Sequence, residues 1–170
     1  MPPAHLLLRL AHRTDTSTLA AMSRDLIENG LGWHYRAERI ERLRRDPDAV
    51  TLVACVGGQI VGFAILQLKD DRAHLVLLAV RPDHQHRGIG RRMTQWLLET
   101  AATAGVASVH VELRADNAAA HALYSAMGFE ETLRLGGYYR GRETAIRMVR
   151  VLRLPGVAPP TWSPPSLDKR

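Results

Sequence analysis

The chain has 170 residues, a formal net charge of +6 and a hydrophobic fraction of 46%, a composition typical of a globular domain. No apolar run approaches the ~20 residues that a membrane-spanning helix needs, and Leu6-Leu7-Leu8 is too short for the core of a signal peptide. The single cysteine, Cys55, excludes an internal disulfide and a cysteine-rich zinc site, so we expect a cytoplasmic setting. The basic charge suits an anionic ligand; direct nucleic-acid binding is disfavoured because no stripe of basic and aromatic residues accompanies it.

The first half of the chain alternates between helical and extended patterns. In chain order these patterns predict a strand over residues 5–10, a helix with apolar positions over 19–27, a charged helix over 36–45, and strands over 50–56, 60–68 and 73–80. Asp15, Thr16 or Ser17 is expected to cap the first helix. Gly57-Gly58 between two β-branched runs predicts a hairpin, so three antiparallel strands follow one another.

The second half predicts a strand–helix–strand crossover, which would make strands 73–80 and 109–113 parallel neighbours. Its predicted elements are helices over about 89–104 and 117–127 and strands over 109–113, 129–134 and 144–151, with a Gly136-Gly137-Tyr138-Tyr139 loop between the last two strands. The pattern indicates an α/β (α+β) fold: a mixed, mostly antiparallel sheet of about six to seven strands, flanked by about four helices. We expect one domain over residues 1–153, and a disordered tail over 154–170, where five prolines occur.

A glycine-bearing turn between strand 73–80 and the following helix is the strongest local signal. Gly88 and Gly90 let backbone approach a ligand with no Cβ in the way. A turn that opens a helix presents free N–H groups at the positive end of the helix dipole, which together form an anion site. Arg87, Arg91 and Arg92 add positive charge beside it. The turn therefore predicts a ligand that carries phosphate or pyrophosphate.

Three glycine-loop motifs compete for this turn, beside the simplest alternative of an ordinary tight turn. The P-loop fails because Arg91-Arg92 stands where Lys-Ser/Thr is required. The dinucleotide fingerprint is weakened because Met93 replaces its third small residue, although an acidic residue, Glu112, follows about 20 positions on. The run from Gln85 to Gly90 resembles the coenzyme A loop of the GNAT acetyltransferases, Gln/Arg-x-x-Gly-x-Gly/Ala, at every fixed position.

A second stretch strengthens this resemblance. Asn117, Ala120, Leu123-Tyr124 and Gly128-Phe129 are similar to the GNAT signature Asn-x-x-Ala-x-x-Leu-Tyr-x-x-x-Gly-Phe, one helix and one strand after the glycine turn. Together with Tyr138-Tyr139 and Glu143-x-Ala145-x-x-Met148, the chain most resembles the bacterial ribosomal-protein-alanine N-acetyltransferase branch, over about residues 50–151. That branch acetylates the α-amino group of a protein N-terminus. The resemblance implies the GNAT fold and acetyl-CoA as the acetyl donor.

Acetyl transfer from a thioester to an amine needs a base that removes a proton from the amine and an acid that protonates the departing thiolate. The resemblance implies that Glu112 is the base and Tyr124 the acid. The structural alternatives are a carboxylate paired with Arg114 for Glu112, and an aromatic core residue for Tyr124.

The resemblance also implies where the two substrates bind. The donor is expected to contact the backbone of Leu78, Ala79 and Val80 through its pantetheine, the turn residues His86, Arg87, Gly88, Ile89, Gly90 and Arg91 through its pyrophosphate, and Asn117, which should also cap its helix. On the acceptor side we expect the segment over residues 30–35, in particular Trp33, and the loop with Tyr138 and Tyr139. Two departures from the branch touch this side: Gly32 replaces a proline before Trp33, and Thr144 replaces an acidic residue.

The expected activity is therefore direct N-acetylation of a primary amine, the α-amino group of a protein N-terminus, by a monomer or homodimer and without an acyl-enzyme. No metal is expected, because His84 and His86 have no acidic ligand at metal-binding spacing. Two alternatives stay open: an acetyltransferase for a small-molecule amine such as an amino acid, polyamine or drug, and a non-catalytic acyl-CoA-binding module.

Overall fold

The computed structural model describes residues 5–139 and 143–153, and the predicted tail over 154–170 lies outside them. The strands are β1 (Leu6–Leu10), β2 (Ala49–Val56), β3 (Gln59–Lys69), β4 (Arg72–Val80), β5 (Ser108–Arg114), β6 (Glu130–Tyr139) and β7 (Glu143–Val151). The α-helices are α1 (Thr16–Met22), α2 (Ala37–Arg45), α3 (Ile89–Thr103) and α4 (Ala118–Ala126), with short 3₁₀ or π segments η1 (Arg13–Asp15), η2 (Ser23–Ile27) and η3 (Pro82–His84).

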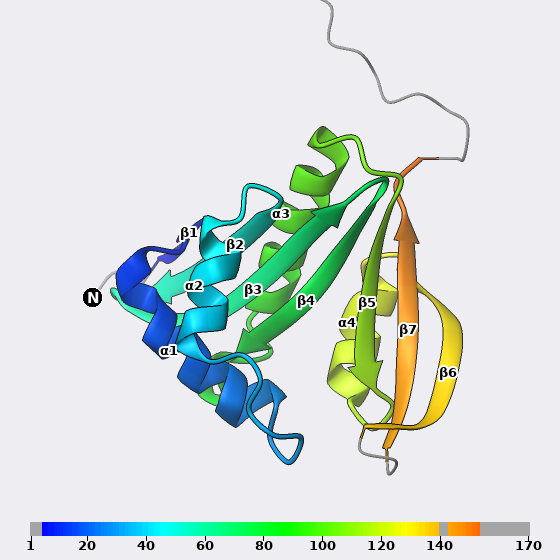
Figure 1. Ribbon diagram of the computed structural model, residues 1–170, viewed down its shortest axis with the longest axis horizontal. Coiled ribbons are helices and arrows are strands. Elements are labelled where there is room, and N and C mark those ends of the chain that lie inside the picture. The colour runs from blue at the N-terminus through cyan, green and yellow to red at the C-terminus, as the bar shows by residue number, and fades with distance from the viewer. Residues whose placement is uncertain (1–4, 140–142, 154–170) are drawn as a thin grey trace, which may run out of the picture.

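The strands form one seven-stranded sheet in the order β1-β2-β3-β4-β5-β7-β6 (Figure 1). Strands β4 and β5 pair in parallel, and the other described neighbours pair antiparallel. The crossover through α3 produces the parallel pair, as the sequence predicts. The expected mixed, mostly antiparallel sheet with four α-helices is therefore confirmed.

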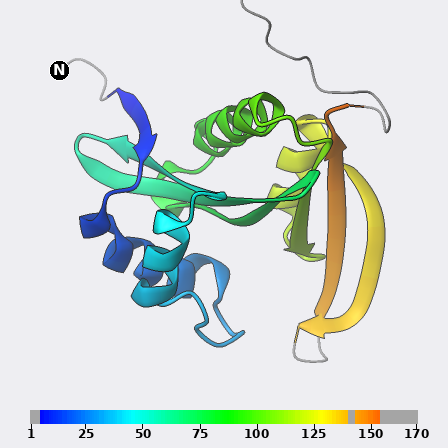
Figure 2. The same cartoon turned by 45° about the horizontal axis from the view of Figure 1, so that its top comes forward.

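Helices cover the sheet on both faces, as Figure 2 shows. On one face, the apolar side chains of α1 and α2 (Leu19 and Ile40 among them) pack on alternate residues of β2 and β3. On the other face, α3 supplies Met93 and Leu97, and α4 supplies Tyr124 to a second core. Because β-strands point successive side chains to opposite faces, the same strands serve both cores.

The first helix differs from its prediction. It begins three residues before α1, as η1, and ends as the π turn η2 instead of running as one α-helix. The early start is stabilised by Asp15, whose carboxylate accepts the His12 N–H at 2.6 Å and pairs with Arg9 at 2.7 Å. The Arg9 hydrogen bond holds the pKa of Asp15 below its usual value. Asp15 therefore stabilises the turn ahead of α1 and makes no side-chain cap to α1 itself.

Strand β6 is longer than predicted. It runs through the glycines that were assigned to a loop, and Leu135 and Tyr139 both have partners on β7. The ladder shifts register between these two pairs, so an irregular, bulged edge accommodates the glycines. Among the described residues, no helix is long and apolar enough to span a membrane.

One extra residue in β4 opens the centre of the sheet. Ile65 pairs with Leu77 and Leu66 pairs with Leu75, which leaves Val76 as a β-bulge. Beyond this bulge Leu77 faces the α1/α2 core, although Leu75, two residues earlier, faces the other core. The pairing of β4 with β5 also stops here, at Leu75 and Val111. Past that point β4 stays with β3 while β5 stays with β7, and the two strands diverge (Figure 1). We call this divergence the fork.

Candidate active site

The fork contains a cavity of about 760 Å³. One wall comes from the end of η2 and the segment that follows it, and the other from the ends of β4 and β5 and the start of α4. Its lining includes Asp25, Glu28, Asn29, His34, Tyr35, Leu75, Leu78, Val111, Glu112, Arg114, Asp116, Asn117, Ala120 and Tyr124. We refer to it as the fork cavity.

Glu112 lies where the two strands separate, one residue past the last β4–β5 pair. Its side chain is 35% exposed, and its Oε1 accepts from Nη2 of Arg147 at 2.6 Å. Arg147 stands directly opposite Glu112 on β7. The pairing with Arg114 that the sequence offered as an alternative is wrong, because Arg114 forms its ion pair with Glu143 instead. Glu112 is thus an accessible carboxylate on the cavity wall.

Tyr124 reaches the same cavity from α4. The residue is only 4% exposed, and its ring packs against Phe129 with the centroids 5.3 Å apart. This burial raises the pKa of the phenol. Tyr124 therefore combines the core role with a place at the cavity, and its hydroxyl stays protonated at neutral pH.

The cap predicted for α4 is confirmed: Oδ1 of Asn117 accepts the N–H of Ala120 at 3.1 Å.

The glycine turn follows directly from β4. Gly88 is the residue before α3 and has a φ of +78°, a left-handed conformation that a side chain would strain. No acidic residue occupies the first turn of α3, so the first N–H groups of the helix face no carboxylate from that turn. The Gln85 side chain donates to the carbonyl of Val80 at 2.9 Å and ties the turn back to the strand. The turn has the electrostatics of an anion site.

The structure thus brings some predicted residues together and separates others. Leu78, Glu112, Asn117 and Tyr124 line the fork cavity. Ala79 and Val80 continue β4 away from it, toward the turn at His86, Arg87, Gly88, Ile89, Gly90 and Arg91. The expected donor site therefore follows one continuous path, from the fork along the end of β4 to the start of α3.

Trp33 lies outside the fork cavity. Its Nε1 donates to the carbonyl of Ala20 at 3.1 Å, and the guanidinium of Arg36 lies 4.8 Å from its ring centroid. It lines a separate hollow of about 380 Å³, which shares Asp25, Glu28 and Asn29 with the fork cavity. Trp33 anchors the segment after η2 rather than facing Glu112. The side chains of Tyr138 and Tyr139, predicted on the acceptor side, lie outside the described residues.

Several residues of the lining were not among the predicted site residues, and three of them have contacts that bear on the site. Tyr35 lines the cavity, and burial raises its pKa. Glu28 is only 7% exposed; its carboxylate accepts from Ser23 Oγ at 2.9 Å and from the His34 N–H at 2.6 Å. Arg114, two residues after Glu112 on β5, reaches across the cavity. Alternation along β5 places Arg114 on the face of Glu112, and Tyr35 ends the segment expected on the acceptor side, whereas nothing in the local sequence marks Glu28.

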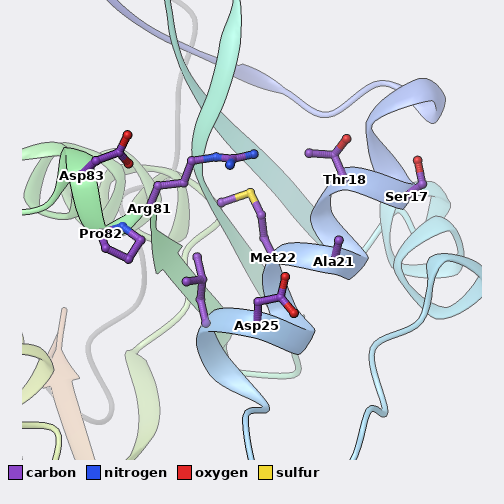
Figure 3. Close-up of a pocket in the computed structure, with 9 residues that line it drawn as sticks. Ser17, Thr18, Ala21, Met22, Asp25, Arg81, Pro82 and Asp83 are labelled. Atoms are coloured by element: carbon purple, nitrogen blue, oxygen red, sulfur yellow. The ribbon is translucent and has the colours of Figure 1, made fainter.

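A third hollow adjoins the fork cavity beside α1 (Figure 3). It has a volume of about 470 Å³ and lies between α1 and η3, with Thr18 and Met22 on one side and Arg81 and Asp83 on the other. It shares Asp25 and Leu26 with the fork cavity. Arg81 donates to the carbonyl of Ile60 at 2.8 Å, so it belongs partly to the scaffold. The fork cavity and this hollow therefore adjoin, and the hollow reaches the segment that precedes the glycine turn.

Comparison with known proteins gives a consistent result. Residues 19–129 match the model of the Acetyltransferase (GNAT) family. The chain is 44% identical over 94 residues to [Ribosomal protein bS18]-alanine N-acetyltransferase of Escherichia coli strain K12, an alignment that covers 54% of this chain and 64% of that relative.

Two solved structures are also similar. The crystal structure of the ribosomal-protein-S18-alanine N-acetyltransferase from Escherichia coli superposes with a TM-score of 0.77 at 29% identity, covering 89% of this chain and 97% of that one. The putative acetyltransferase yncA from Salmonella typhimurium, solved with its cofactor acetyl-CoA, has a TM-score of 0.76 at 21% identity and covers 92% of this chain and 99% of that one. At this identity the second likeness concerns the fold.

Proposed function

Because the chain belongs to the GNAT acetyltransferase family, we propose that it transfers an acetyl group from acetyl-CoA directly to a primary amine, the α-amino group of a protein N-terminus. The observation that carries this proposal is the fork. It places an accessible carboxylate, Glu112, and a buried phenol, Tyr124, on one cavity. The path from this cavity to the glycine turn offers a site for an extended, pyrophosphate-bearing donor.

The residues present fit acetyl-CoA. Past Leu75, β4 has no β5 partner, so alternate backbone groups of residues 76–80 are available to pair with the pantetheine arm as a strand would. Gly88, Gly90 and the first N–H groups of α3 suit the pyrophosphate. An added Cβ on Gly90 would lie 3.4 Å from Leu123, so the turn is already close-packed against α4.

The proposed chemistry uses two proton transfers. Glu112 takes a proton from the acceptor ammonium, directly or through one water, and leaves a neutral amine. The amine nitrogen forms a bond to the acetyl carbon, and the carbon–sulfur bond breaks. Tyr124 gives its proton to the departing thiolate and recovers one from the amide nitrogen or solvent. A backbone N–H of residues 78–80 polarises the acetyl carbonyl, which stabilises charge that develops on its oxygen.

The charge of the cavity suits an amine acceptor. Its charged lining consists of one guanidinium, Arg114, and four carboxylates: Asp25, Glu28, Glu112 and Asp116. Two of these carboxylates pair with arginines that are not part of the lining, Asp25 with Arg24 and Glu112 with Arg147, so the lining itself is acidic although the chain has a formal charge of +6. An ammonium group is attracted to such a site before it is deprotonated. This electrostatic contrast supports an amine over an anionic or neutral acceptor.

The choice of a protein N-terminus is supported by the 44%-identical relative, whose name states that it acetylates an alanine of ribosomal protein bS18. The alignment covers 64% of that relative, so its substrate comes to this chain as part of the proposal. A small-molecule amine is the second candidate, favoured by the departures at Gly32 and Thr144, which fall on the acceptor side. We propose a cytoplasmic setting, in line with the single cysteine.

The test has two stages. First, a thermal-shift panel uses acetyl-CoA, coenzyme A, NAD and ATP; a ligand at ~100 times its Kd stabilises the fold by about 2.7 kcal/mol, which raises Tm by several degrees. Second, mass spectrometry measures acetylation of peptides with free N-termini beside an amino acid and a polyamine. A shift with coenzyme A forms and a 42-dalton gain (roughly one acetyl group) on peptides alone supports the proposal. A shift with NAD only would refute it, and turnover of small amines only would favour the second candidate.

A further inference from the structure

The wall of the fork cavity opposite β5 is an irregular segment. Between η2 and α2 the chain runs through residues 28–36 without helix or strand. Together with Ile27, the last residue of η2, the part of this segment up to Tyr35 lies along the cavity, and we call residues 27–35 the acceptor wall. Its internal support is the buried Glu28 carboxylate, which accepts the backbone N–H groups of His34 at 2.6 Å and Tyr35 at 3.2 Å. Glu28 thereby closes the segment on itself, but these bonds do not attach it to the sheet.

Arg114 attaches it. Its Nη2 donates to the carbonyl of Ile27 at 3.1 Å and to the carbonyl of Asn29 at 2.8 Å. These carbonyls are 87 and 85 residues away in the sequence. The arginine side chain therefore crosses from β5 to the acceptor wall and holds two of its backbone groups. A charged donor makes stronger hydrogen bonds to carbonyls than a neutral one does.

The β5 end of the Arg114 side chain is also held in place. Its Nε lies 3.5 Å from Glu143 Oε2 on β7, and the next residue, Ala115, donates its N–H to the carbonyl of Thr144 at 2.8 Å. The arginine side chain is 23% exposed, and it lines the cavity. One guanidinium thus joins β5, β7 and the acceptor wall around the space where the acceptor would lie.

We infer that Arg114 is a positioning residue that fixes the acceptor wall against the sheet and so sets the affinity for the acceptor amine, an inference that rests on the proposed function. Arg114 does not need to touch the reacting atoms. Without it, the wall keeps its Glu28 closure and the Trp33 hydrogen bond to α1 but loses its attachment to β5, so each acceptor must order the part around Ile27 and Asn29 as it binds. That cost appears in the acceptor KM, whereas the donor path along β4 and α3 is unaffected.

The experiment compares Arg114→Ala and Arg114→Lys with Arg44→Ala. Arg44 is a matched control: it is 25% exposed, makes two 2.8 Å bonds to Glu41, and lies on α2 outside the cavity lining. For Arg114→Ala we expect the acceptor KM to rise about tenfold, as the loss of charge-assisted bonds predicts. We expect kcat to stay within about twofold and the acetyl-CoA KM to stay unchanged. Arg114→Lys should restore little, because an ammonium lacks the planar fork of donors.

An unchanged acceptor KM in Arg114→Ala would overturn the inference, as would an equal rise of both KM values. If the alanine variant does not fold, amide hydrogen exchange of the lysine variant decides. We expect faster exchange over residues 28–35 than in wild type and in Arg44→Ala, and equal exchange would refute the attachment of the acceptor wall by Arg114. If wild type acetylates no amine, the proposed function fails, and the exchange experiment still tests whether Arg114 holds the acceptor wall. If wild type turns over normally and the variants match it, only this inference fails.

Discussion

The two sides of the fork cavity are built in different ways. The donor side is contiguous: β4, its bulge at Val76, the glycine turn and the start of α3 follow one another within about 17 residues, 76–92. The acceptor side is assembled from distant parts, since Arg114 of β5 holds the carbonyls of Ile27 and Asn29. The difference teaches that a local stretch of sequence specifies the donor site, whereas tertiary contacts specify the acceptor site. The two sides should therefore respond separately to mutation.

The largest effect is expected at Glu112, where the two sides meet. Glu112→Gln should lower kcat by about a hundredfold to ten-thousandfold, because positioned general bases contribute at this scale. The acetyl-CoA KM should change little, since the donor path does not include the carboxylate. Steady-state kinetics across pH checks this, with a flatter profile in the variant. Glu131→Gln, an exposed carboxylate paired with Arg134, is the control. Unchanged kcat in Glu112→Gln would remove it as the base.

Tyr124→Phe should have the next largest effect, a fall in kcat of at least about tenfold, because only the proton donor is lost. The ring and its contact with Phe129 remain, so Tm should change little. Since burial raises the pKa of the phenol, wild-type activity should show no alkaline loss from Tyr124 in the ordinary assay range. If the variant chiefly loses Tm while kcat holds, Tyr124 is a core residue and the acid lies elsewhere.

A substitution in the glycine turn should act on the donor side alone. Gly88 has a φ of +78°, and a side chain in that conformation costs about 1 kcal/mol, which corresponds to about a fivefold rise in the acetyl-CoA KM if the turn changes shape. Gly88→Ala should leave the acceptor KM unaltered, the reverse of Arg114→Ala. Gly57→Ala, in the β2–β3 turn with a φ of +57°, is the matched control for backbone strain. A higher acceptor KM in Gly88→Ala would contradict the separation of the two sides.

The smallest effect is expected at Asn117, which belongs to α4. Asn117→Ala removes the hydrogen bond to Ala120 and should reduce the free energy of unfolding by about 1 kcal/mol. Asn117→Asp keeps an effective cap and should retain the stability. Chemical denaturation measures the change in the free energy of unfolding. The acetyl-CoA KM of the two variants then shows whether Asn117 also contacts the donor. Equal unfolding free energies for Asn117→Ala and wild type would show that the cap contributes little.

The same contrast explains what the sequence could predict. The glycine turn and the Asn117 cap depend on neighbours a few residues apart, and the crossover follows from the order of one strand, one helix and one strand along the chain; the structure has all three. The ion pair of Glu112 depends on which residue of β7 lies opposite, and the register places Arg147 there, while Arg114 of β5 itself pairs with Glu143. Side-chain identities alone do not determine a strand register, because it is set by the whole pairing pattern.

Two other differences have the same origin. Trp33 was expected on the acceptor side; it belongs to the acceptor wall but lies outside the lining of the fork cavity, and its indole N–H is donated to the Ala20 carbonyl, a partner that only the packed α1 provides. The glycines near Tyr138 suggested a loop, yet pairing with β7 extends β6 through them. In both places a tertiary partner outweighs a local preference. The family resemblance was confirmed because its fixed positions lie in the local, donor-side and α4 motifs.

The bulge at Val76 gives the donor side a particular kind of robustness. The fork exists because β4 carries one residue more than β3 between two fixed pairs, Ile65–Leu77 and Leu66–Leu75. That property is a matter of chain length, and a point substitution leaves the residue count intact. Deleting Val76 would make Leu75 and Leu77 consecutive on their present faces, so the strand would regain regular alternation and lose the bulge. The divergence of β4 and β5 therefore depends on the number of residues in β4 and not on the identity of the side chains. A deletion at the bulge would remove it, whereas point substitutions would leave it in place.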